Sequence, residues 1–511
     1  MTRETEKGFV YLVGAGPGRP DLITIRGVEL LRQADCVIWD KLVHPSLLNY
    51  APAGAEIIHT PKRAGAGSFT QEQINKLLIE KAVEGKVVVR LKGGDPCIFG
   101  RGAEEAAALA EAGVDFEIVP GVTAGIAAGE YAGIMLTDRR FSSQVVFVTG
   151  QEAEGKEQSS IDWDLLAKFR GTIVFYMGMG NLDFIVEQLI RNDMDEQMPA
   201  AVIADATTAN QRMVQTELCK LGQKCKQEKI EAPAIVIIGK AAEGNPQLNW
   251  FMRKPLFGKN IVVTRDRRGN ADFAARIISE GGNPLIFDAI RIEPLTKSGE
   301  FLKAIVTLKE YDWIIFTSAN GVNVFFEAVI SLGGDARVFG AAKVAAIGSE
   351  TAEKLSQFGI KADFVPSEFT SQQLAKQLAG FANLKNKDVL LLRSDIASSE
   401  LAELLEKTKA KVLDVPVYSV VTERSDSKWL IEKIVAGKVH WLTFCSPSSV
   451  RGFFEQIPAE MVKSSSAKTA SIGPVTSEEL KKLGIKVDIE AAEHTIGGLI
   501  NELKRFCAGV V

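Results

Sequence analysis

Short runs of aliphatic and β-branched residues alternate with amphipathic segments of helix length along nearly the whole chain. Examples are FVYLVG at residues 9–14, VVVRLK at 87–92 and WIIF at 313–316. Apolar runs of this length, separated by segments long enough for a helix, are typical of strands that are buried on both faces of a parallel sheet. The alternation therefore predicts an α/β protein in which most strands run parallel.

The size and charge of the chain narrow its class further. A chain of 511 residues is longer than a domain with a single hydrophobic core normally is, so we expect several compact units. The formal net charge of -4 provides no overall positive field, which argues against nucleic acid or an anionic membrane as the main partner. Because no apolar run approaches the ~20 residues that cross a bilayer, and the first residues lack a signal-peptide core, we expect a cytoplasmic protein.

The cysteines and histidines do not predict a metal site. The 6 cysteines show no paired C-x2-C spacing, and the 4 histidines form no H-E-x-x-H arrangement. We therefore expect reduced thiols and a reaction that uses no metal ion.

One break in the periodicity predicts the main domain boundary. Residues 244–258 (GNPQLNWFMRKPLFG) collect Gly, Pro and Asn and interrupt the alternation of strands and helices. We expect a first unit over residues 1–250, a linker over 251–256 and a second unit over 257–511.

The second unit contains an internal repeat. Residues 313–327 (WIIFTSANGVNVFFE) match 441–455 (WLTFCSPSSVRGFFE), and 346–363 match 471–488 in the same order. Each copy of the first pair is predicted to form a strand, a serine-containing turn and a helix. Two similar lobes joined by a hinge normally enclose a ligand cleft, so we expect a bilobed α/β unit.

A glycine-rich turn, GAGPG at residues 14–18, follows the first predicted strand. Glycine lets the backbone approach a ligand closely because it has no Cβ atom. The dinucleotide fingerprint G-x-G-x-x-G would need another glycine where the sequence has Arg19, and no suitably placed ribose-binding acid follows. These departures disfavour a nicotinamide-dependent dehydrogenase, while a plain strand-to-helix turn stays open as an alternative.

A second glycine-rich turn, Gly93-Gly94-Asp95, directly follows the predicted strand at 87–92. Ligands of α/β sheets bind at the carboxyl ends of strands, where two adjacent glycines expose backbone amides and carbonyls. An apolar strand-end pocket with a few fixed polar groups suits S-adenosylmethionine, which carries an amino acid, a sulfonium and a ribose. A bare turn is the alternative interpretation.

Six segments that occur in order over residues 9–250 resemble the uroporphyrinogen III C-methyltransferases. They are GAGPG, ADCVIWDKLV, PKRAG, RLKGGDPCIFGRGAEE, PGVTAGIAAGEYAGIMLTDRR and VFYMGMGNL. The resemblance implies the two-domain tetrapyrrole methylase fold, split near residues 120–140, with the active cleft between the subdomains and a homodimer as the assembly. It also implies two methylations of uroporphyrinogen III, at C2 and C7, which give precorrin-2 by way of precorrin-1 with S-adenosylmethionine as methyl donor.

The same resemblance implies roles for individual residues. Asp40 and Lys62 match the proton acceptor and donor, while Arg101, Glu104 and Arg139 match positions linked to substrate binding. A carboxylate suits proton removal, and the forked guanidinium group suits a macrocycle ringed by carboxylates. The positions implied for S-adenosylmethionine are Pro17, Gly93, Gly94, Asp95, Ile98, Thr123, Ala124, Met177 and Ala206.

Two residues depart from the family pattern. Cys97 stands where an aromatic residue is common, and Asp138 stands where a histidine is common. We expect Asp138 to weaken carboxylate binding by repulsion, because it lies beside Arg139.

Residues 257–505 resemble the uroporphyrinogen III synthases in VVTRDR, FTSANGV, AIGSETAEKL, LLLRSD, VPVYSVVT, FCSPSSV and SIGPVTSEEL. That family cyclises hydroxymethylbilane and inverts its last pyrrole ring, a lyase reaction without metal or coenzyme. The implied fold has a discontinuous first lobe, here 257–293 with 425–511, and a second lobe over 294–424. The synthase half would make the compound that the methyltransferase half consumes.

Candidate site residues of this half lie mainly at strand-to-helix turns. Tyr418 matches the tyrosine that is proposed to assist departure of the substrate hydroxyl, with a structural, partly buried tyrosine as the alternative. Arg265, Ser318, Ser446 and Thr476 are candidates for carboxylate contacts, because helix N-termini bind anions, although simple N-capping would also explain the hydroxyls. Duplicated lobes also build binding proteins, so a non-catalytic small-molecule sensor is the alternative for this half.

Overall fold

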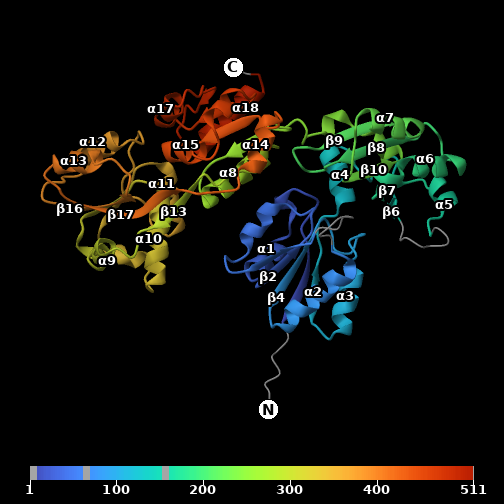
Figure 1. The fold of residues 1–511 in the computed structure, drawn as a ribbon, viewed down its shortest axis with the longest axis horizontal. Helices are drawn as coiled ribbons and strands as arrows, with labels where there is room; N and C mark the ends of the chain where they lie inside the picture. Colours follow the sequence, from blue (N-terminus) through green and yellow to red (C-terminus); the bar gives the residue numbers. More distant parts are fainter. Residues whose placement is uncertain (1–7, 61–68, 152–159, 510–511) are drawn as a thin grey trace, which may run out of the picture. The chain divides into compact units, whose positions relative to one another are not determined.

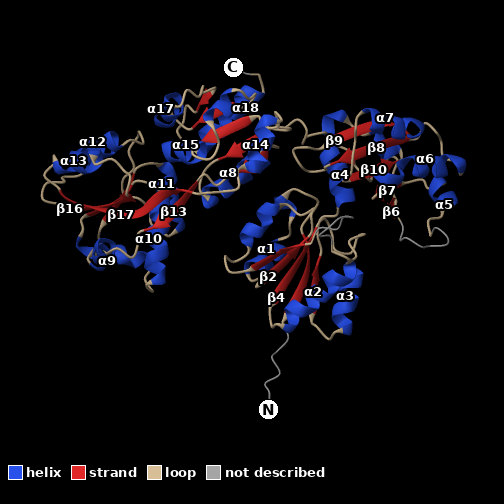
Figure 2. Ribbon diagram, in the orientation of Figure 1, coloured by secondary structure: helices blue, strands red, loops and turns tan. Residues whose placement is uncertain are grey.

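The structure is a computed structural model that describes residues 8–60, 69–151 and 160–509. The chain forms two compact units, the first made of residues up to 260 with 275–284 and the second of 261–274 with 285–511. Both units are layered arrangements of strands and helices (Figures 1 and 2). Within the described ranges, none of the helices combines the length and apolar character that a membrane span requires.

The first sheet of the first unit is entirely parallel, with the strand order β3-β2-β4-β1-β5. Because all strands run the same way, their carboxyl ends meet at one edge, where ligands of α/β sheets bind. Its strands are β1 (Phe9–Gly14), β2 (Cys36–Trp39), β3 (Glu56–His59), β4 (Val87–Lys92) and β5 (Phe116–Val119). The helices that connect them are α1 (Ile25–Arg32), α2 (Gln71–Val83) and α3 (Gly102–Glu111).

The second sheet of this unit is mixed, with the order β6-β7-β10-β8-β9. Only β6 and β7 are parallel, whereas β10 runs antiparallel to β7 and β8, and β8 runs antiparallel to β9. Its strands are β6 (Val145–Thr149), β7 (Thr172–Tyr176), β8 (Pro199–Ala204), β9 (Arg212–Glu217) and β10 (Ala234–Ile238).

The expectation of mostly parallel strands is wrong for this second sheet. The connection between β8 and β9, residues 205–211, is too short for the crossover that parallel strands need. The strands nevertheless read as continuous apolar runs, because helices cover both faces of the sheet. One face packs against α4 (Ala124–Ala132), and the other packs against α6 (Leu182–Arg191) and α7 (Leu221–Gln227).

The second unit contains two further five-stranded sheets, in the orders β12-β11-β18-β19-β20 and β13-β17-β16-β14-β15. The chain starts the first of these sheets, builds the whole second sheet and then returns to complete the first. The exact lobe boundaries stay a prediction. The strands are β11 (Asn260–Val263), β12 (Asn283–Ile286), β13 (Ile290–Pro294), β14 (Trp313–Phe316), β15 (Lys343–Ala346), β16 (Asp388–Ser394), β17 (Lys411–Thr422), β18 (Trp441–Phe444), β19 (Lys468–Ser471) and β20 (Ile489–Glu490).

The repeated segments of the sequence form matching local structures in this unit. After β14, the Ser318 Oγ accepts the Gly321 N–H at 3.0 Å and caps α10 (Ala319–Ser331). After β18, the Ser446 Oγ accepts the Ser449 N–H at 3.1 Å and caps α15 (Pro447–Phe454). The repeat thus encodes a strand, a serine cap and a helix in both sheets.

Three loops at the carboxyl edge of the first sheet approach one another so closely that side chains are excluded. A Cβ atom on Gly121, after β5, would lie 2.3 Å from the Gly94 carbonyl oxygen and 2.8 Å from the Gly14 Cα. Gly94 and Gly16 also exchange backbone hydrogen bonds of 2.7 and 3.3 Å. Glycine at these positions is therefore a condition for closing the edge.

We expect Gly121→Ala to lower the free energy of unfolding of the first unit by about 1–3 kcal/mol, because the added methyl group meets backbone atoms that cannot turn away. Urea unfolding of the variant and the wild type measures the difference. Gly180→Ala is the matched control, since no described atom lies within 4 Å of its Cβ position. Equal destabilisation by both substitutions would contradict the steric explanation.

Candidate active site

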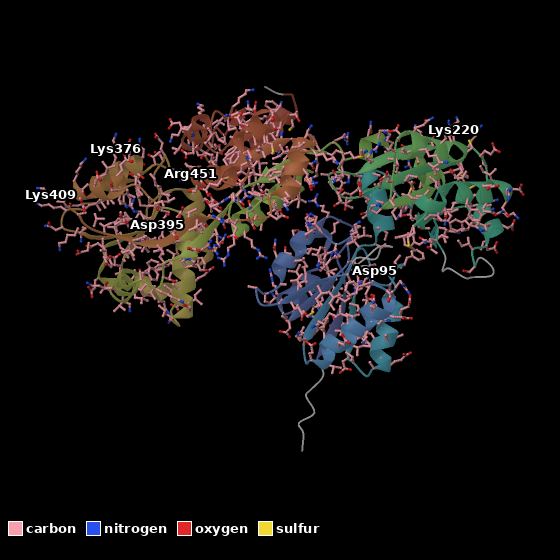
Figure 3. All side chains as sticks on the ribbon, in the orientation of Figure 1. Asp95, Lys220, Lys376, Asp395, Lys409 and Arg451 are labelled. Atoms are coloured by element: carbon pink, nitrogen blue, oxygen red, sulfur yellow. The ribbon has the colours of Figure 1, made fainter. Side chains whose placement is uncertain are left out.

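The positions implied for S-adenosylmethionine come from loops that meet at the carboxyl edge of the first sheet. Pro17 follows β1, the Gly93–Asp95 turn follows β4, and Thr123 follows β5 and directly precedes α4. Figure 3 labels Asp95 at this end of the sheet. Residues far apart in the sequence are thus neighbours at one edge.

The Asp95 carboxylate joins two of these loops. Its Oδ1 accepts the N–H groups of Cys97 and Ile98 at 2.8 and 3.1 Å, and its Oδ2 accepts the Gly121 N–H at 3.0 Å. The bonds from Cys97 and Ile98 fix the turn after β4, and the charge-assisted bond from Gly121 holds this turn against the loop after β5. Asp95 therefore shapes the edge on which a ligand would lie.

Tyr176, at the end of β7, attaches the second sheet to the start of α4. Its hydroxyl accepts the Gly125 N–H at 2.8 Å and lies 2.8 Å from the Thr123 Oγ1. Burial raises the pKa of Tyr176, so the phenol stays protonated. The ring also contacts the Phe99 ring, with the centroids 5.0 Å apart. The sequence analysis missed Tyr176, although it directly precedes the candidate Met177.

Thr207 connects the loop after β1 with the loop after β8. Its Oγ1 donates to the Pro17 carbonyl at 3.2 Å and accepts the Arg19 N–H at 3.1 Å. The candidate Ala206 directly precedes it. The sequence analysis missed Thr207 because ADATTAN shows no periodicity that would single out one hydroxyl.

Unusual backbone conformations gather where these loops meet. Met177, Asp205 and Thr207 have φ angles of 53°, 47° and 69°, in the left-handed region that non-glycine residues rarely occupy. Such conformations cost of order 1 kcal/mol or more each and collect at functional sites. Two apolar candidates are solvent-accessible here, Ile98 at 37% and Met177 at 48% exposure. Fixed backbone polar groups beside accessible apolar side chains suit an adenosyl amino acid.

Asp40, the implied proton acceptor, lies just beyond β2 and forms an ion pair with Arg90 of β4. The Arg90 side chain is completely buried, and it also donates to the Ile38 carbonyl and the Thr60 Oγ1, both at 3.3 Å. The Asp40 side chain keeps 22% exposure, so one side of the carboxylate stays accessible. Lys62 lies outside the described residues.

The candidates for substrate binding are largely exposed. Arg101 and Glu104 pair with each other through bonds of 2.7 and 2.6 Å, and Arg139 is exposed. The Asp138 carboxylate pairs with Arg140 at 2.9 and 2.7 Å, which lowers the Asp138 pKa to about 2. The expectation that Asp138 weakens binding of substrate carboxylates stays a prediction.

In the second unit, the structure brings together two of the five candidates. The Tyr418 hydroxyl on β17 lies 2.9 Å from the Ser318 Oγ at the start of α10. Burial raises the pKa of Tyr418, and the charges of Asp266 and Asp395 act in the same direction. The phenol is therefore a protonated group at neutral pH.

The other three candidates are either buried or already in contact with other groups of the protein. The Ser446 Oγ serves as the cap of α15, and Thr476 is 3% exposed within α17 (Pro474–Lys482). Arg265 lies 3.9 Å from the Glu350 carboxylate. For Ser446, the capping alternative describes the hydroxyl correctly.

A charged cleft of about 510 Å³ opens in the second unit. The buried Asn270 donates to the Asp288 carboxylate at 2.8 Å, and burial raises the Asp288 pKa. The charged lining of this cleft was not predicted from the sequence, although the arginines of TRDRR were a visible signal. The charged residues that line the cleft are Asp266, Arg267, Arg268, Asp288, Arg291, Glu327 and Glu423.

The chain matches two known families in succession. Residues 10–222 match the family described as "Tetrapyrrole (Corrin/Porphyrin) Methylases", and residues 271–501 match "Uroporphyrinogen-III synthase HemD". The two matched segments do not overlap. The second contains Ser318, Tyr418, Ser446 and Thr476, whereas Arg265 lies just before it.

Three curated relatives illustrate the similarity. "Porphyrin biosynthesis protein HemD" of Ruminiclostridium josui is 38% identical over 507 residues, which is 99% of both chains. "Uroporphyrinogen-III C-methyltransferase" of Bacillus subtilis (strain 168) is 32% identical over 84% of this chain and 88% of its own. "S-adenosyl-L-methionine-dependent uroporphyrinogen III methyltransferase" of Methanosarcina barkeri is 45% identical over 45% of this chain and 91% of its own. The chain belongs to the family in which a tetrapyrrole methylase is fused to a uroporphyrinogen-III synthase.

Proposed function

We propose that this protein is a bifunctional enzyme of tetrapyrrole biosynthesis. The second unit cyclises hydroxymethylbilane to uroporphyrinogen III with inversion of ring D. The first unit methylates that product at C2 and C7, which gives precorrin-2 by way of precorrin-1. The observation that carries the proposal is the similarity of both family segments, in the same order, to a porphyrin biosynthesis relative over 99% of the chain.

For the methylation, S-adenosylmethionine supplies an electrophilic methyl group when it is bound. The backbone of Gly93, Gly94, Thr123 and Ala124 would hold its polar groups, with Asp95 fixing the shape of the turn. Pro17, Ile98, Met177 and Ala206 would enclose its apolar parts. This division agrees with the polar backbone and the accessible apolar side chains at the sheet edge.

Proton transfer and substrate binding complete the methylation. Asp40 takes up the proton that the methylated ring system loses from a neighbouring methylene bridge, and Lys62 acts as the proton donor. Arg101, Glu104 and Arg139 bind the substrate periphery. Because Arg101 and Glu104 form an exposed ion pair, typically worth about 0–1 kcal/mol, a substrate carboxylate exchanges with Glu104 at little cost.

For the cyclisation, Tyr418 donates a proton to the departing hydroxyl group, and Ser318 orients the phenol. Arg265, Ser446 and Thr476 contact substrate carboxylates, through backbone amides where the hydroxyl already serves as a cap. The arginines of the charged cleft provide further binding groups for the carboxylates of the substrate.

The proposal includes the predicted organisation of the chain. The methyltransferase occupies residues 1–250, and a linker over 251–256 leads to the synthase over 257–511. Within the synthase, lobe 1 comprises 257–293 with 425–511, and lobe 2 comprises 294–424. The enzyme works in the cytoplasm as a homodimer formed through its methyltransferase half.

Hydroxymethylbilane and S-adenosylmethionine, supplied together to the whole protein, should yield a dimethylated type III tetrapyrrole. Mass spectrometry and isomer analysis identify the product. Uroporphyrinogen III supplied directly should yield the same product and tests the methyltransferase alone. If only the type I isomer forms from hydroxymethylbilane, the second unit is a binding module instead of a synthase.

Asp95→Ala should raise the Kd for S-adenosylhomocysteine by about tenfold or more, because three backbone amides lose their acceptor and the turn loosens. Isothermal titration calorimetry measures the change. Asp164→Ala is the control, since the Asp164 side chain is 63% exposed on another surface. An unchanged affinity in Asp95→Ala would contradict the shaping role of this carboxylate.

Tyr418→Phe should lower the rate of uroporphyrinogen III formation by about 10²-fold or more, because the variant keeps the ring but loses the acidic proton. A stopped assay with isomer separation gives the rate. Tyr311→Phe, in the same half of the chain, should retain the wild-type rate. A rate within twofold of wild type in Tyr418→Phe would assign this tyrosine a structural role.

A further inference from the structure

A second carboxylate lies behind the proposed methyltransferase base, in the interior of the first unit. Glu105 of α3 is completely buried. Its Oε1 accepts hydrogen bonds from the Lys92 Nζ at 2.9 Å, the Gln71 Nε2 at 3.1 Å and the Arg90 Nε at 3.3 Å. Among the described residues, its buried Oε2 has no hydrogen-bond partner. A buried carboxylate oxygen without a partner is unusual for a group whose only task is to stabilise the fold.

Arg90 connects Glu105 to the surface. The Arg90 Nε faces Glu105, and the neighbouring Nη2 pairs with Asp40. Arg90 and Lys92 alternate along β4, so they project from the same face of the sheet. The result is a continuous series of alternating charges, Asp40, Arg90, Glu105 and Lys92, of which only Asp40 is accessible to solvent.

The charges of this series balance only while Asp40 is ionised. Two cations then face two carboxylates, and proton uptake by Asp40 leaves a net positive charge in a buried environment. Burial lowers the pKa of Lys92, and the charge of Arg90 lowers it further. Glu105 is the one buried anion in this series, so its charge and position control how strongly the cations stabilise the Asp40 carboxylate.

Among the described residues, the charged groups in the ion-pair series that reaches Asp40 are Arg90 and Lys92 from β4 and Glu105 from α3. From the β3 side, Thr60 contributes a hydroxyl that binds Arg90, and the His59 ring stacks on Trp39 at a centroid distance of 4.3 Å.

We infer that Glu105 is a positioning residue for methyl transfer, which holds Arg90 against Asp40 and limits the positive charge that Asp40 experiences. This inference rests on the proposed role of Asp40 as the proton acceptor. In that step the methyl group bonds to the ring carbon and leaves its sulfonium, a C–H bond of the methylene bridge beside the methylated ring breaks, and its electron pair neutralises the positive charge left on that ring. The proton passes to an Asp40 carboxylate oxygen, and Glu105 does not take part in the transfer.

The test compares two substitutions that change the charge of the cluster in opposite directions. Glu105→Gln removes a negative charge with little change of shape, so the cations act more strongly on Asp40 and its carboxylate becomes a weaker base. Lys92→Met removes a positive charge, so the Asp40 carboxylate becomes a stronger base. The acidic limb of the kcat profile against pH should therefore move down in Glu105→Gln and up in Lys92→Met, each by at least about 0.5 pH unit.

The rate and the binding constant separate this effect from general damage to the fold. In Glu105→Gln we expect kcat for uroporphyrinogen III methylation to fall about tenfold, with the Kd for S-adenosylhomocysteine within about twofold of wild type. Glu111→Gln, an exposed position on the same helix, should match the wild type in all three measurements. If Glu105→Gln does not fold, the pH profile of Lys92→Met still tests whether the buried charges act on Asp40: an upward shift supports the inference, and an unchanged profile contradicts it.

Two results would overturn the inference. One is a pH profile that does not move in either variant, and the other is a fall in kcat that only parallels a loss of S-adenosylhomocysteine affinity. Asp40→Asn distinguishes this failure from failure of the proposed function. If Asp40→Asn keeps the wild-type rate, the role of Asp40 is wrong. If it abolishes the rate while the Glu105→Gln profile stays unchanged, only the role of Glu105 is wrong.

Discussion

The close approach of three backbone loops at the carboxyl edge of the first sheet is the constraint on which the candidate methyltransferase site depends. Gly14 and Gly121 leave no room for side chains between the loops, Gly94 adopts a positive φ of 71°, and the Asp95 carboxylate bonds two amides of its own turn and the Gly121 amide of the neighbouring loop. Tyr176 and Thr207 attach the second sheet of the unit to this edge. A ligand bound there would meet a surface whose shape is set before binding, which reduces the ordering cost of association.

Beneath that edge, the same strand that ends in the glycine turn carries two buried cations. Burying charge is costly unless each ion is paired, and replacing such a cluster with apolar residues is often neutral or stabilising. The presence of Arg90, Lys92 and Glu105 in the interior is therefore better explained by an effect on the accessible Asp40 than by stability. The second unit differs in this respect, because its cleft is lined by both arginines and carboxylates.

Much of the fold and of the candidate site could be predicted from local pattern. The alternation of apolar runs indicated α/β architecture, and the ordered motifs identified the family and the strand-end loops. The antiparallel pairing of β8 with β9 and β10 could not be predicted, because strands covered on both faces read as apolar runs in either direction. The pairing of Asp138 with Arg140 was missed because adjacent arginines project differently from a turn.

By itself, the sequence determined the class of the fold, the two family segments and the residue types available at each strand end, since these follow from periodicity and motif order. Only the tertiary structure decided which of those residues touch. Arg90 meets Asp40 across 50 positions, and Thr207 meets Pro17 across 190. Contacts at such separations depend on how sheets and helices pack, and local propensity carries no information about them.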